Sequence, residues 1–320
     1  MKIAIVGVGA VGGYFGGRMI EHGLDVTLLA RAETARVLKR DGLHIASILG
    51  DFSVDHPNIA DDPSSLQPMD VVFLAVKAYQ VAAAAKFASA VVGPDTTVIP
   101  LQNGVDAPKA AASILGEEVV IGGLSRIFSE RVKTGRIRHS DIRPSIAFGE
   151  LRGGISERVA SIAEHLAPVS TIDAQASEDI VTDMWKKLLM VATLGAVGAV
   201  SRAPAGVLRS LDPIRATLLS VAAEIGAVAR SQGADVAPEF SANCLNVLEK
   251  LTPETTASMH RDIVHGLPSE LEEQVGAVIR YGIAAGVGTP VLSTIYGALL
   301  PGELRARGKV EFDDLPAADG

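Results

Sequence analysis

The sequence predicts an α/β protein with an N-terminal Rossmann-type doubly wound sheet and an all-α C-terminal domain. In the first half, short apolar runs rich in β-branched residues alternate with helical segments, as in parallel sheets whose strands are joined by helices. In the second half no strand pattern persists, and prolines stand near the starts of successive helical segments, where a missing N–H costs little. We expect the two domains to cover residues 1–174 and 175–320.

The first 21 residues predict the strand, turn and helix of a dinucleotide-binding unit. The apolar run from Ile3 to Val6 predicts a buried strand, and residues 14–21 predict a helix. Between them lies the pattern G-x-G-x-x-G, in the context that the fingerprint requires. Gly7 would make the tight turn, Gly9 would let the backbone approach a pyrophosphate, and Gly12 would allow close helix–strand packing. The alternative is a structural glycine turn without a ligand. We expect the diphosphate at the helix N-terminus, against Gly7, Val8, Gly9, Ala10, Val11 and Gly12.

The end of the second predicted strand, residues 25–30, favours NADP over NAD. NAD-preferring folds place an acidic residue near this point to bind the ribose 2′-hydroxyl, whereas an arginine accommodates a 2′-phosphate. Here Arg31 follows the strand, and Glu33 more plausibly begins the next helix. The other interpretation of Arg31 is a solvated loop cation.

Two further buried strands are predicted over residues 70–76 and 96–101, and residues 43–55 predict a strand or hairpin. Lys77 directly follows the first of these strands, and Asn103 lies two residues beyond the second. Ligands of doubly wound folds bind at the carboxyl ends of strands. Taken alone, the lysine could be a solvated loop charge, and the asparagine could belong to an Asn-Gly turn.

The rest of the first domain predicts a strand over residues 119–124 and a hairpin over residues 126–150 that extends the sheet. Residues 156–166 predict an amphipathic helix with a serine cap, and residues 169–172 a last strand. The second domain predicts helices at about 178–200, 213–232, 238–250, 255–264, 269–285 and 290–300.

The first helix of the second domain contains two adjacent lysines, Lys186 and Lys187, after Trp185. The following residues are apolar and small, and a lysine desolvated on such a helix has a lowered pKa that suits it to proton transfer. The alternative for either lysine is a surface cation whose stem packs on the helix. Trp185 alone is most simply a core residue.

A second cluster of polar residues lies within residues 256–272. Ser269 is expected to cap the helix that begins at Glu270, which could be an ordinary first-turn acid. His260 and His265 have no companion ligand at a recognisable spacing, so we expect no metal site.

Composition favours a cytoplasmic protein without a nucleic-acid or membrane partner. The net charge of −8 argues against nucleic acid or an anionic membrane as the partner. The single cysteine, Cys244, fits a reducing compartment, and the chain starts directly with a strand rather than a signal peptide. The longest uncharged apolar run, residues 188–201, is too short to span a bilayer. A homodimer is a possible assembly that the sequence does not specify.

The motifs taken together resemble the ketopantoate reductase (2-dehydropantoate 2-reductase) family along essentially the whole chain. The motifs that carry the resemblance stand in the family's order: the glycine pattern of residues 7–12, Val76-Lys-Ala-Tyr-Gln80, Gln102-Asn-Gly104, Trp185-Lys-Lys-Leu188, Ser258-Met259, Asp262-Ile263 and Ser269-Glu270. The resemblance implies that NADPH reduces a 2-oxo acid, ketopantoate in pantothenate biosynthesis, in a cleft between a Rossmann domain and a helical domain.

The resemblance also implies roles for individual residues. Lys187 would be the proton donor, with Lys186 as its exposed neighbour. Asn103 would lie beside the nicotinamide and the substrate, Ser258 would contact the substrate, and Glu270 would lie at the nicotinamide-ribose end. Lys77 and Arg31 would lie near the adenosine phosphate of the cofactor.

One departure from the family pattern concerns the substrate. The family has two asparagines that hydrogen-bond the substrate, four and eight residues after the lysine, and here these positions hold Val191 and Gly195. Since polar groups built to bind a substrate normally set its identity, an NADP-dependent paralogue with a different, less polar substrate is an alternative.

Two other functions remain open. A catalytically silent NADP(H)-binding redox sensor would not need Lys187, so the retained lysine motif argues against it. A different Rossmann dehydrogenase, such as a 3-hydroxyacid enzyme, would call for a catalytic histidine or a lysine in another helical context.

Overall fold

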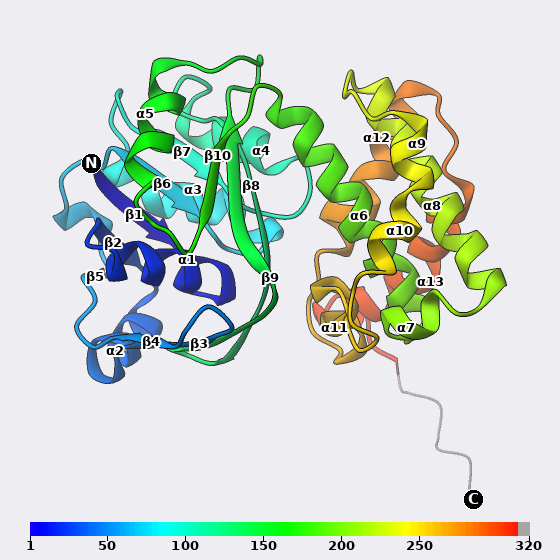
Figure 1. The fold of residues 1–320 in the computed structure, drawn as a ribbon, viewed down its shortest axis with the longest axis horizontal. Helices are drawn as coiled ribbons and strands as arrows, with labels where there is room; N and C mark the ends of the chain where they lie inside the picture. The colour runs from blue at the N-terminus through cyan, green and yellow to red at the C-terminus, as the bar shows by residue number, and fades with distance from the viewer. Residues whose placement is uncertain (313–320) are drawn as a thin grey trace, which may run out of the picture. The chain divides into compact units, whose positions relative to one another are not determined.

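The first unit of the chain, Met1–Met184, is built on a five-stranded parallel sheet in the computed structural model, which describes residues 1–312 (Figure 1). Each neighbouring pair of strands is parallel, and Ile5 at the centre pairs with Leu28 on one side and Phe73 on the other. The strands, in spatial order, are β5 (Ile59–Ala60), β2 (Asp25–Leu29), β1 (Lys2–Val6), β6 (Val71–Leu74) and β7 (Thr97–Pro100).

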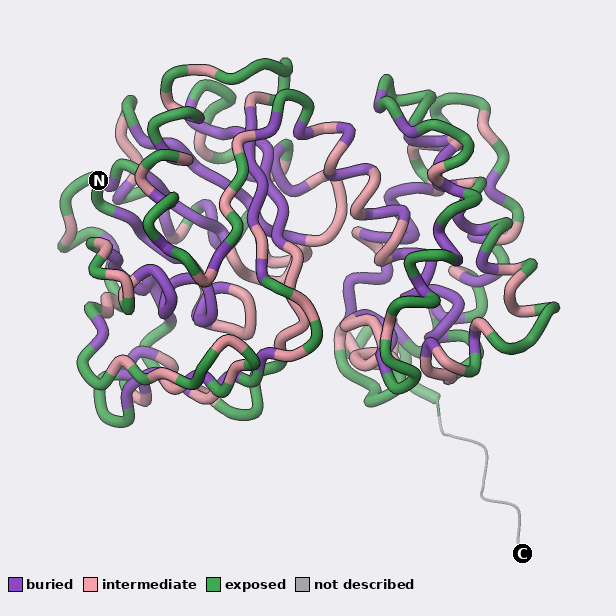
Figure 2. Tube along the Cα trace, in the orientation of Figure 1, coloured by how far each residue is buried: buried purple, intermediate pink, exposed green. Residues whose placement is uncertain are grey.

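Helices cover both faces of this sheet, which confirms the doubly wound fold. Successive side chains of β1 point to opposite faces, so Ile3 and Ile5 join one core and Ala4 and Val6 another. The first core includes α1 (Ala10–Glu21), and the second includes α3 (Val81–Ala88) and α4 (Ala107–Leu115). Apart from Lys2 at the start of β1, the central strands β1 and β6 are accordingly buried (Figure 2).

A second sheet accompanies the first, and it corrects two predictions. The predicted hairpin exists as β8 (Gly122–Lys133) and β9 (Arg136–Gly149), but it does not extend the parallel sheet. Instead β9 pairs in parallel with β3 (Leu43–Ser47) and β10 (Asp173–Ala176), and β3 pairs antiparallel with β4 (Phe52–Val54). Of the strand predicted over 119–124, Val120 makes one parallel bridge to Val98, and only residues 122–124 belong to a strand, the start of β8.

Helix α1 lies between the two sheets because its glycines let both approach. A Cβ on Gly16 would lie 2.9 Å from Leu28 of the first sheet, and one on Gly17 would lie 2.9 Å from Ile45 of the second. Both distances are shorter than real Cβ contacts, so larger side chains would push the sheets apart.

The strand predicted over residues 169–172 is wrong. Val169 and Ile172 are buried, but their N–H groups donate to the carbonyl groups of Leu166 and Val169 in tight turns after helix α5 (Glu157–Leu166). Apolar burial without a strand ladder explains the misleading pattern. The serine cap of α5 is confirmed, since the Ser156 hydroxyl accepts the N–H of Val159. A further helix, α2 (Ala32–Asp41), follows β2.

The second unit begins at Trp185, and its described residues form helices and connecting loops without a strand. The predicted helix over 238–250 divides at Asn243, and helix α7 was not predicted. A π-helical segment, Glu272–Gly276, precedes α12. The helices are α6 (Ile180–Ser201, which begins in the first unit), α7 (Ala205–Leu208), α8 (Asp212–Ser231), α9 (Pro238–Ala242), α10 (Cys244–Leu248), α11 (Ser258–Val264), α12 (Ala277–Ala285) and α13 (Pro290–Ala306).

Among the described helices, α6 alone has the length and hydropathy of a membrane span. However, 67% of its most apolar window is buried inside the structure, as expected for a core helix.

Candidate active site

The glycine turn lies at the carboxyl edge of the parallel sheet. At this point the helices that follow two neighbouring strands pack on opposite faces of the sheet. After β1 the chain enters α1 on one face, and after the neighbouring β6 it enters α3 on the other. Ligands of doubly wound folds bind at this switch point. Backbone hydrogen bonds hold the edge together, from Gly7 N to Leu29 O at 3.0 Å and from Ala75 N to Val6 O at 2.8 Å.

Two glycines of the turn are required by the packing of the backbone. Gly7 has a φ of +96°, which side chains rarely adopt, and a Cβ there would lie 2.7 Å from Cγ1 of Val76. A Cβ on Gly12 would overlap the carbonyl oxygen of Gly7 and lie 2.8 Å from the Cβ of Ala75. The turn and the close helix–strand contact thus have the geometry that the sequence predicts.

The third glycine leaves open space in front of helix α1. A Cβ on Gly9 would meet no atom within 4 Å, and Gly9 has no side chain to cap the first N–H groups of the helix. Ala10 and Val11 are half-buried, whereas the side chain of Val8 belongs to the core, so only its backbone could face a ligand. Unfilled space and uncapped N–H groups fit a diphosphate, and these residues are suited to hold a dinucleotide.

Lys77 and Asn103 lie at the same edge, held by a buried glutamine. The side-chain nitrogen of Gln102 donates to the carbonyl oxygens of Leu74, at 2.8 Å, and Val76, at 3.0 Å. These bonds join the end of β7 to the end of β6. Lys77 and Asn103, which follow the ends of these two strands, are both half-buried. The positioning role of Gln102 was not predicted, although this residue directly follows an apolar strand and belongs to the motif Gln102-Asn-Gly104.

Arg31 follows β2, next to the glycine turn. It is exposed and stands at the N-terminus of α2, two residues beyond Leu29, the residue whose carbonyl group accepts the N–H of Gly7. Glu33 pairs with Arg36 within the first turn of α2, as expected of an acid that starts a helix. The exposed position of Arg31 is compatible with a phosphate ligand and with a solvated cation alike.

In the second unit, Lys187 lies on the core helix α6. It is half-buried between the buried residues Trp185 and Leu188. Trp185 is a core residue, as expected, and its ring packs edge-on to that of Tyr281 at 5.7 Å. Lys186 is half-buried rather than exposed, with its ammonium group 6.0 Å from the centre of the Phe240 ring.

The face of α6 beyond Lys187 is apolar. Val191 and Gly195 follow at intervals of four residues, which places them on the same face. A Cβ on Gly195 would lie 2.8 Å from Cε of Met259, so the methionine covers the glycine. Ser258, which begins α11 and precedes Met259, is half-buried.

Glu270 is buried in the second unit, with 4% of its surface exposed. One of its carboxylate oxygens accepts a hydrogen bond from the side chain of Gln274 at 3.2 Å. The Ser269 hydroxyl oxygen accepts the N–H of Leu271 at 3.2 Å, as expected of a cap, but the helical segment begins at Leu271 rather than at Glu270.

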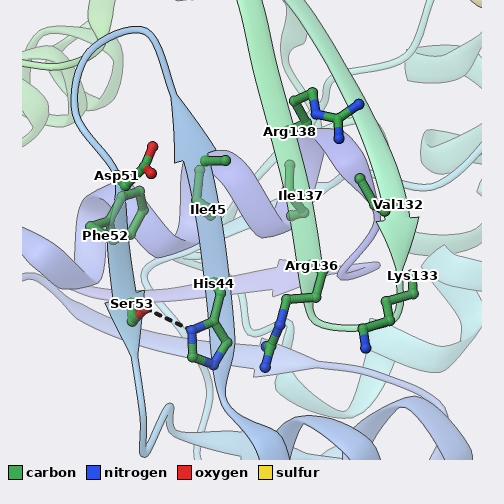
Figure 3. Close-up of a pocket in the computed structure, with 11 residues that line it drawn as sticks. His44, Ile45, Asp51, Phe52, Ser53, Val132, Lys133, Arg136, Ile137 and Arg138 are labelled. Carbon is green, nitrogen blue, oxygen red and sulfur yellow. Dashed lines mark hydrogen bonds between the residues drawn. The ribbon is translucent and has the colours of Figure 1, made fainter.

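A separate pocket of about 460 Å³ lies on the second sheet and contains none of the predicted site residues (Figure 3). His44, Arg136 and Lys133 point toward the same end of the strands, and Arg138 lies toward the other (Figure 3). Its cations have nearby acids: Arg138 pairs with Glu130 at 2.8 Å, and Asp51 also lines the pocket. Across residues 1–312, no cluster of three or more His, Cys, Asp or Glu side chains is arranged to hold a metal ion.

Comparison with known proteins identifies the family. The model of "Ketopantoate reductase PanE/ApbA" matches residues 3–153, and that of its C-terminal domain matches residues 179–303. An uncharacterized oxidoreductase of Bacillus subtilis, YkpB, is 30% identical over 299 residues, covering 93% of this chain and 98% of the relative. The chain belongs to the ketopantoate reductase family.

Relatives named as 2-dehydropantoate 2-reductases agree with this chain in sequence and fold. A 2-dehydropantoate 2-reductase of Nostoc sp. is 30% identical over 302 residues, covering 93% of this chain and 94% of the relative. The crystal structure of 2-dehydropantoate 2-reductase from Geobacter metallireducens is 26% identical with a TM-score of 0.88, covering 94% of this chain and 99% of that one.

The fold also occurs in a ternary structure of D-mandelate dehydrogenase with NADH and anilino(oxo)acetate. That chain is 22% identical with a TM-score of 0.86, covering 96% of this chain and 100% of that one. The members of the ketopantoate reductase family are oxidoreductases that act on CH–OH donors, and this chain is one of them.

Proposed function

We propose that this ketopantoate reductase family member reduces a 2-oxo acid to a 2-hydroxy acid with NADPH, and that the substrate is 2-dehydropantoate, which becomes pantoate in pantothenate biosynthesis. The observation that carries the proposal is the open glycine turn at the switch point of the sheet, where a Cβ on Gly9 would meet nothing within 4 Å. In a family of CH–OH oxidoreductases, such a turn is a site for the dinucleotide that exchanges hydride with the substrate.

The first domain, residues 1–174 in this proposal, binds the cofactor. NADPH, when bound, supplies the hydride. The N–H groups at the start of α1 hold the diphosphate, and Arg31 and Lys77 neutralise the adenosine phosphate. Asn103, at the end of β7, orients the nicotinamide end and the substrate. The arginine at the end of β2, in place of an acid, supports NADPH rather than NADH.

The helical domain, residues 175–320, supplies the proton. The ammonium group of Lys187 donates a hydrogen bond to the carbonyl oxygen of the substrate, stabilises the negative charge that develops there, and transfers a proton to it. Its half-buried place on α6 limits competition from water. Ser258 binds the substrate, and Glu270 binds the ribose at the nicotinamide end.

A second candidate substrate is a 2-oxo acid with an apolar side chain. Val191 and Gly195 offer no hydrogen bond, and Met259 covers Gly195. An apolar surface beside Lys187 would favour an apolar substituent. The likeness in fold to D-mandelate dehydrogenase, solved with anilino(oxo)acetate, is in keeping with this alternative.

The test is the initial rate of NADPH oxidation by the purified protein with ketopantoate and a panel of 2-oxo acids with aliphatic and aromatic side chains, with NADH as the cofactor control. Fast, NADPH-selective turnover of ketopantoate supports the first substrate. Preference for an apolar 2-oxo acid supports the second. NADPH binding without turnover of any member would contradict both and favour a redox sensor.

We further propose a cytoplasmic protein with no nucleic-acid or membrane partner, and a homodimer as its possible assembly. The single cysteine, Cys244, is buried, and burial raises the pKa of its thiol to about 11. A thiol of this kind is unreactive, in keeping with a structural role in a reducing compartment.

A further inference from the structure

Ser269 occupies an unusual place for an irregular segment, because it is fully buried. It lies in the loop between α11 and the helical segment that starts at Leu271, with 0% of its surface exposed. Buried loop backbone has no helix or strand partner for its N–H and C=O groups, and each group left unpaired would destabilise the fold. These groups must therefore find partners elsewhere.

The last turn of α13 and Arg307, the residue that follows this helix, supply those partners. The carboxylate of Glu303 accepts the N–H of Ser269 at 3.1 Å and also accepts its hydroxyl proton. Arg307 donates from Nη2 to the carbonyl oxygen of Ser269 at 2.7 Å, and from Nε to Glu303 at 2.6 Å. The N–H, the hydroxyl and the carbonyl group of one loop residue are thus all bound by one ion pair, which we call the Glu303–Arg307 clamp.

The clamp is costly to bury, which indicates that it does more than stabilise a helix end. The side chain of Glu303 is 4% exposed and that of Arg307 is 21% exposed. An ion pair removed from water loses solvation that its attraction often fails to repay, and an exposed pair at this spacing would stabilise α13 equally well. What the buried pair adds is a fixed geometry for the Ser269 loop.

The next residue in the loop is Glu270, whose carboxylate needs a fixed orientation. Glu270 is 4% exposed and lies near other acids. Burial raises the pKa of the Glu273 carboxyl, the charge of Arg307 lowers it, and the charges of Glu270 and Glu303 raise it. Repulsion among these carboxylates would displace a loosely held loop, and the side chain of Gln274 contributes a hydrogen bond of 3.2 Å to one oxygen of Glu270.

We propose that Glu303 and Arg307 are positioning residues that hold the Ser269 loop so that the carboxylate of Glu270 is oriented toward the cofactor. The inference rests on the proposed function, because it takes the role of Glu270 in binding the nicotinamide ribose from there. Neither clamp residue touches the cofactor in this proposal; both act through Glu270.

A double-mutant cycle on the full-length protein tests the clamp. Its readouts are the dissociation constant of NADPH and the steady-state parameters KM and kcat for the reduction of the 2-oxo acid. Glu270→Gln should weaken NADPH binding about tenfold, the effect of one lost charge-assisted hydrogen bond. Glu303→Gln keeps the shape of the side chain but loses its charge, and should weaken binding about three- to tenfold. In the Glu270→Gln background, Glu303→Gln should have no further effect, because residues that act through one group are not additive.

Two further variants guard against a trivial result. Arg307→Lys keeps the charge but cannot bridge Ser269 and Glu303 together, so it should reproduce the Glu303→Gln effect if that variant does not fold. Glu150→Gln is the matched control, because Glu150 forms a similar partly buried pair with Arg158 at 2.7 Å in the first unit. It should leave the dissociation constant and kcat unchanged.

The outcomes separate the clamp from the proposed function. Folded Glu303→Gln and Arg307→Lys variants with unchanged NADPH affinity and kcat, beside a weakened Glu270→Gln variant, would overturn the clamp alone. Equal losses from Glu303→Gln in both backgrounds would indicate a merely structural role and also overturn it. An ineffective Glu270→Gln would overturn the role of Glu270 in the proposed function, and the clamp with it.

Discussion

The side-chain nitrogen of Gln102 donates a hydrogen bond to the carbonyl oxygen of Val76 at 3.0 Å. This bond joins the ends of β7 and β6 one residue before Asn103 and Lys77. The two predicted cofactor contacts of this edge therefore depend on one buried side chain, which is 5% exposed.

Replacing Gln102 with leucine should weaken both folding and cofactor binding. The carbonyl group of Leu74 keeps its bond from Leu101 N, but that of Val76 loses the bond from the Gln102 side chain. We expect a loss of about 1–3 kcal/mol in the free energy of unfolding, measured by urea denaturation, and weaker NADPH binding. Unchanged stability together with unchanged NADPH affinity would show that this bond does not position the edge.

Alanine at Gly12 should destabilise the fold, whereas alanine at Gly9 should not. Gly12→Ala would force a methyl group onto the Gly7 carbonyl oxygen, so it should cost about 1–3 kcal/mol of stability and abolish NADPH binding. Gly9→Ala has open space and an extended backbone, so it should fold normally but bind NADPH at least about tenfold more weakly. Thermal unfolding and NADPH titration of both variants check this pair. If Gly9→Ala bound NADPH as tightly as the unchanged protein, the result would support the alternative that the glycine turn is structural and binds no ligand.

Arg31→Ala should weaken the binding of NADPH but not that of NADH. If the guanidinium group binds the 2′-phosphate, its loss should weaken NADPH binding about 10- to 100-fold and leave NADH binding unchanged, since NADH lacks that phosphate. Fluorescence titration with both cofactors measures the two constants. Equal affinities before and after the change would identify Arg31 as a solvated cation.

His139 should make the first unit less stable in acid. Burial lowers the pKa of its ring. The ring is 2% exposed, its Nδ1 lies 2.8 Å from the Ser47 hydroxyl, and its Nε2 lies 2.8 Å from the carbonyl oxygen of Ile142. The Ser47 hydroxyl oxygen accepts the N–H of Leu49, which leaves its proton for Nδ1 and favours the neutral ring.

The direction of the pH effect follows from this lowered pKa. The unfolded chain binds a proton at His139 below about pH 6.5 while the folded chain does not, so stability is complete above that pH and falls as the pH decreases. His139→Gln should remove this part of the pH dependence. The measurement is the free energy of unfolding by urea of both proteins across this range. Identical slopes against pH would contradict the lowered pKa, because they would mean that the ring binds its proton equally well in the folded and unfolded chains.

Local patterns predicted much of the fold, and long-range pairing explains the rest. The strand of Ile3–Val6, the Gly7 turn and helix α1 were predicted because apolar periodicity and a positive-φ glycine are written within a few residues. The second sheet was not predicted. Its strand β9 pairs with β3 and β10, which lie far from β9 in the sequence, so the pairing leaves no local signal. Val169 and Ile172 show that burial alone imitates a strand.

The site divides in the same way. The glycine positions were predictable because each has a conformational or packing reason in its own motif. The residues that position the site could not be predicted in this way. Gln102 is one polar residue after a strand, and Glu303 and Arg307 resemble the solvated charges common at the end of a helix. Their importance depends on which distant backbone groups they bind, and the structure was needed to identify them.

The most direct test of the central claim is the turnover of Lys187→Ala beside its NADPH affinity, with Lys186→Ala as the matched control on the adjacent position of α6. If Lys187 protonates the developing alkoxide, kcat should fall about 10²- to 10⁴-fold while the dissociation constant of NADPH stays within about twofold. Lys186→Ala should keep both values. Retained turnover of Lys187→Ala would contradict the account and move the proton donor elsewhere.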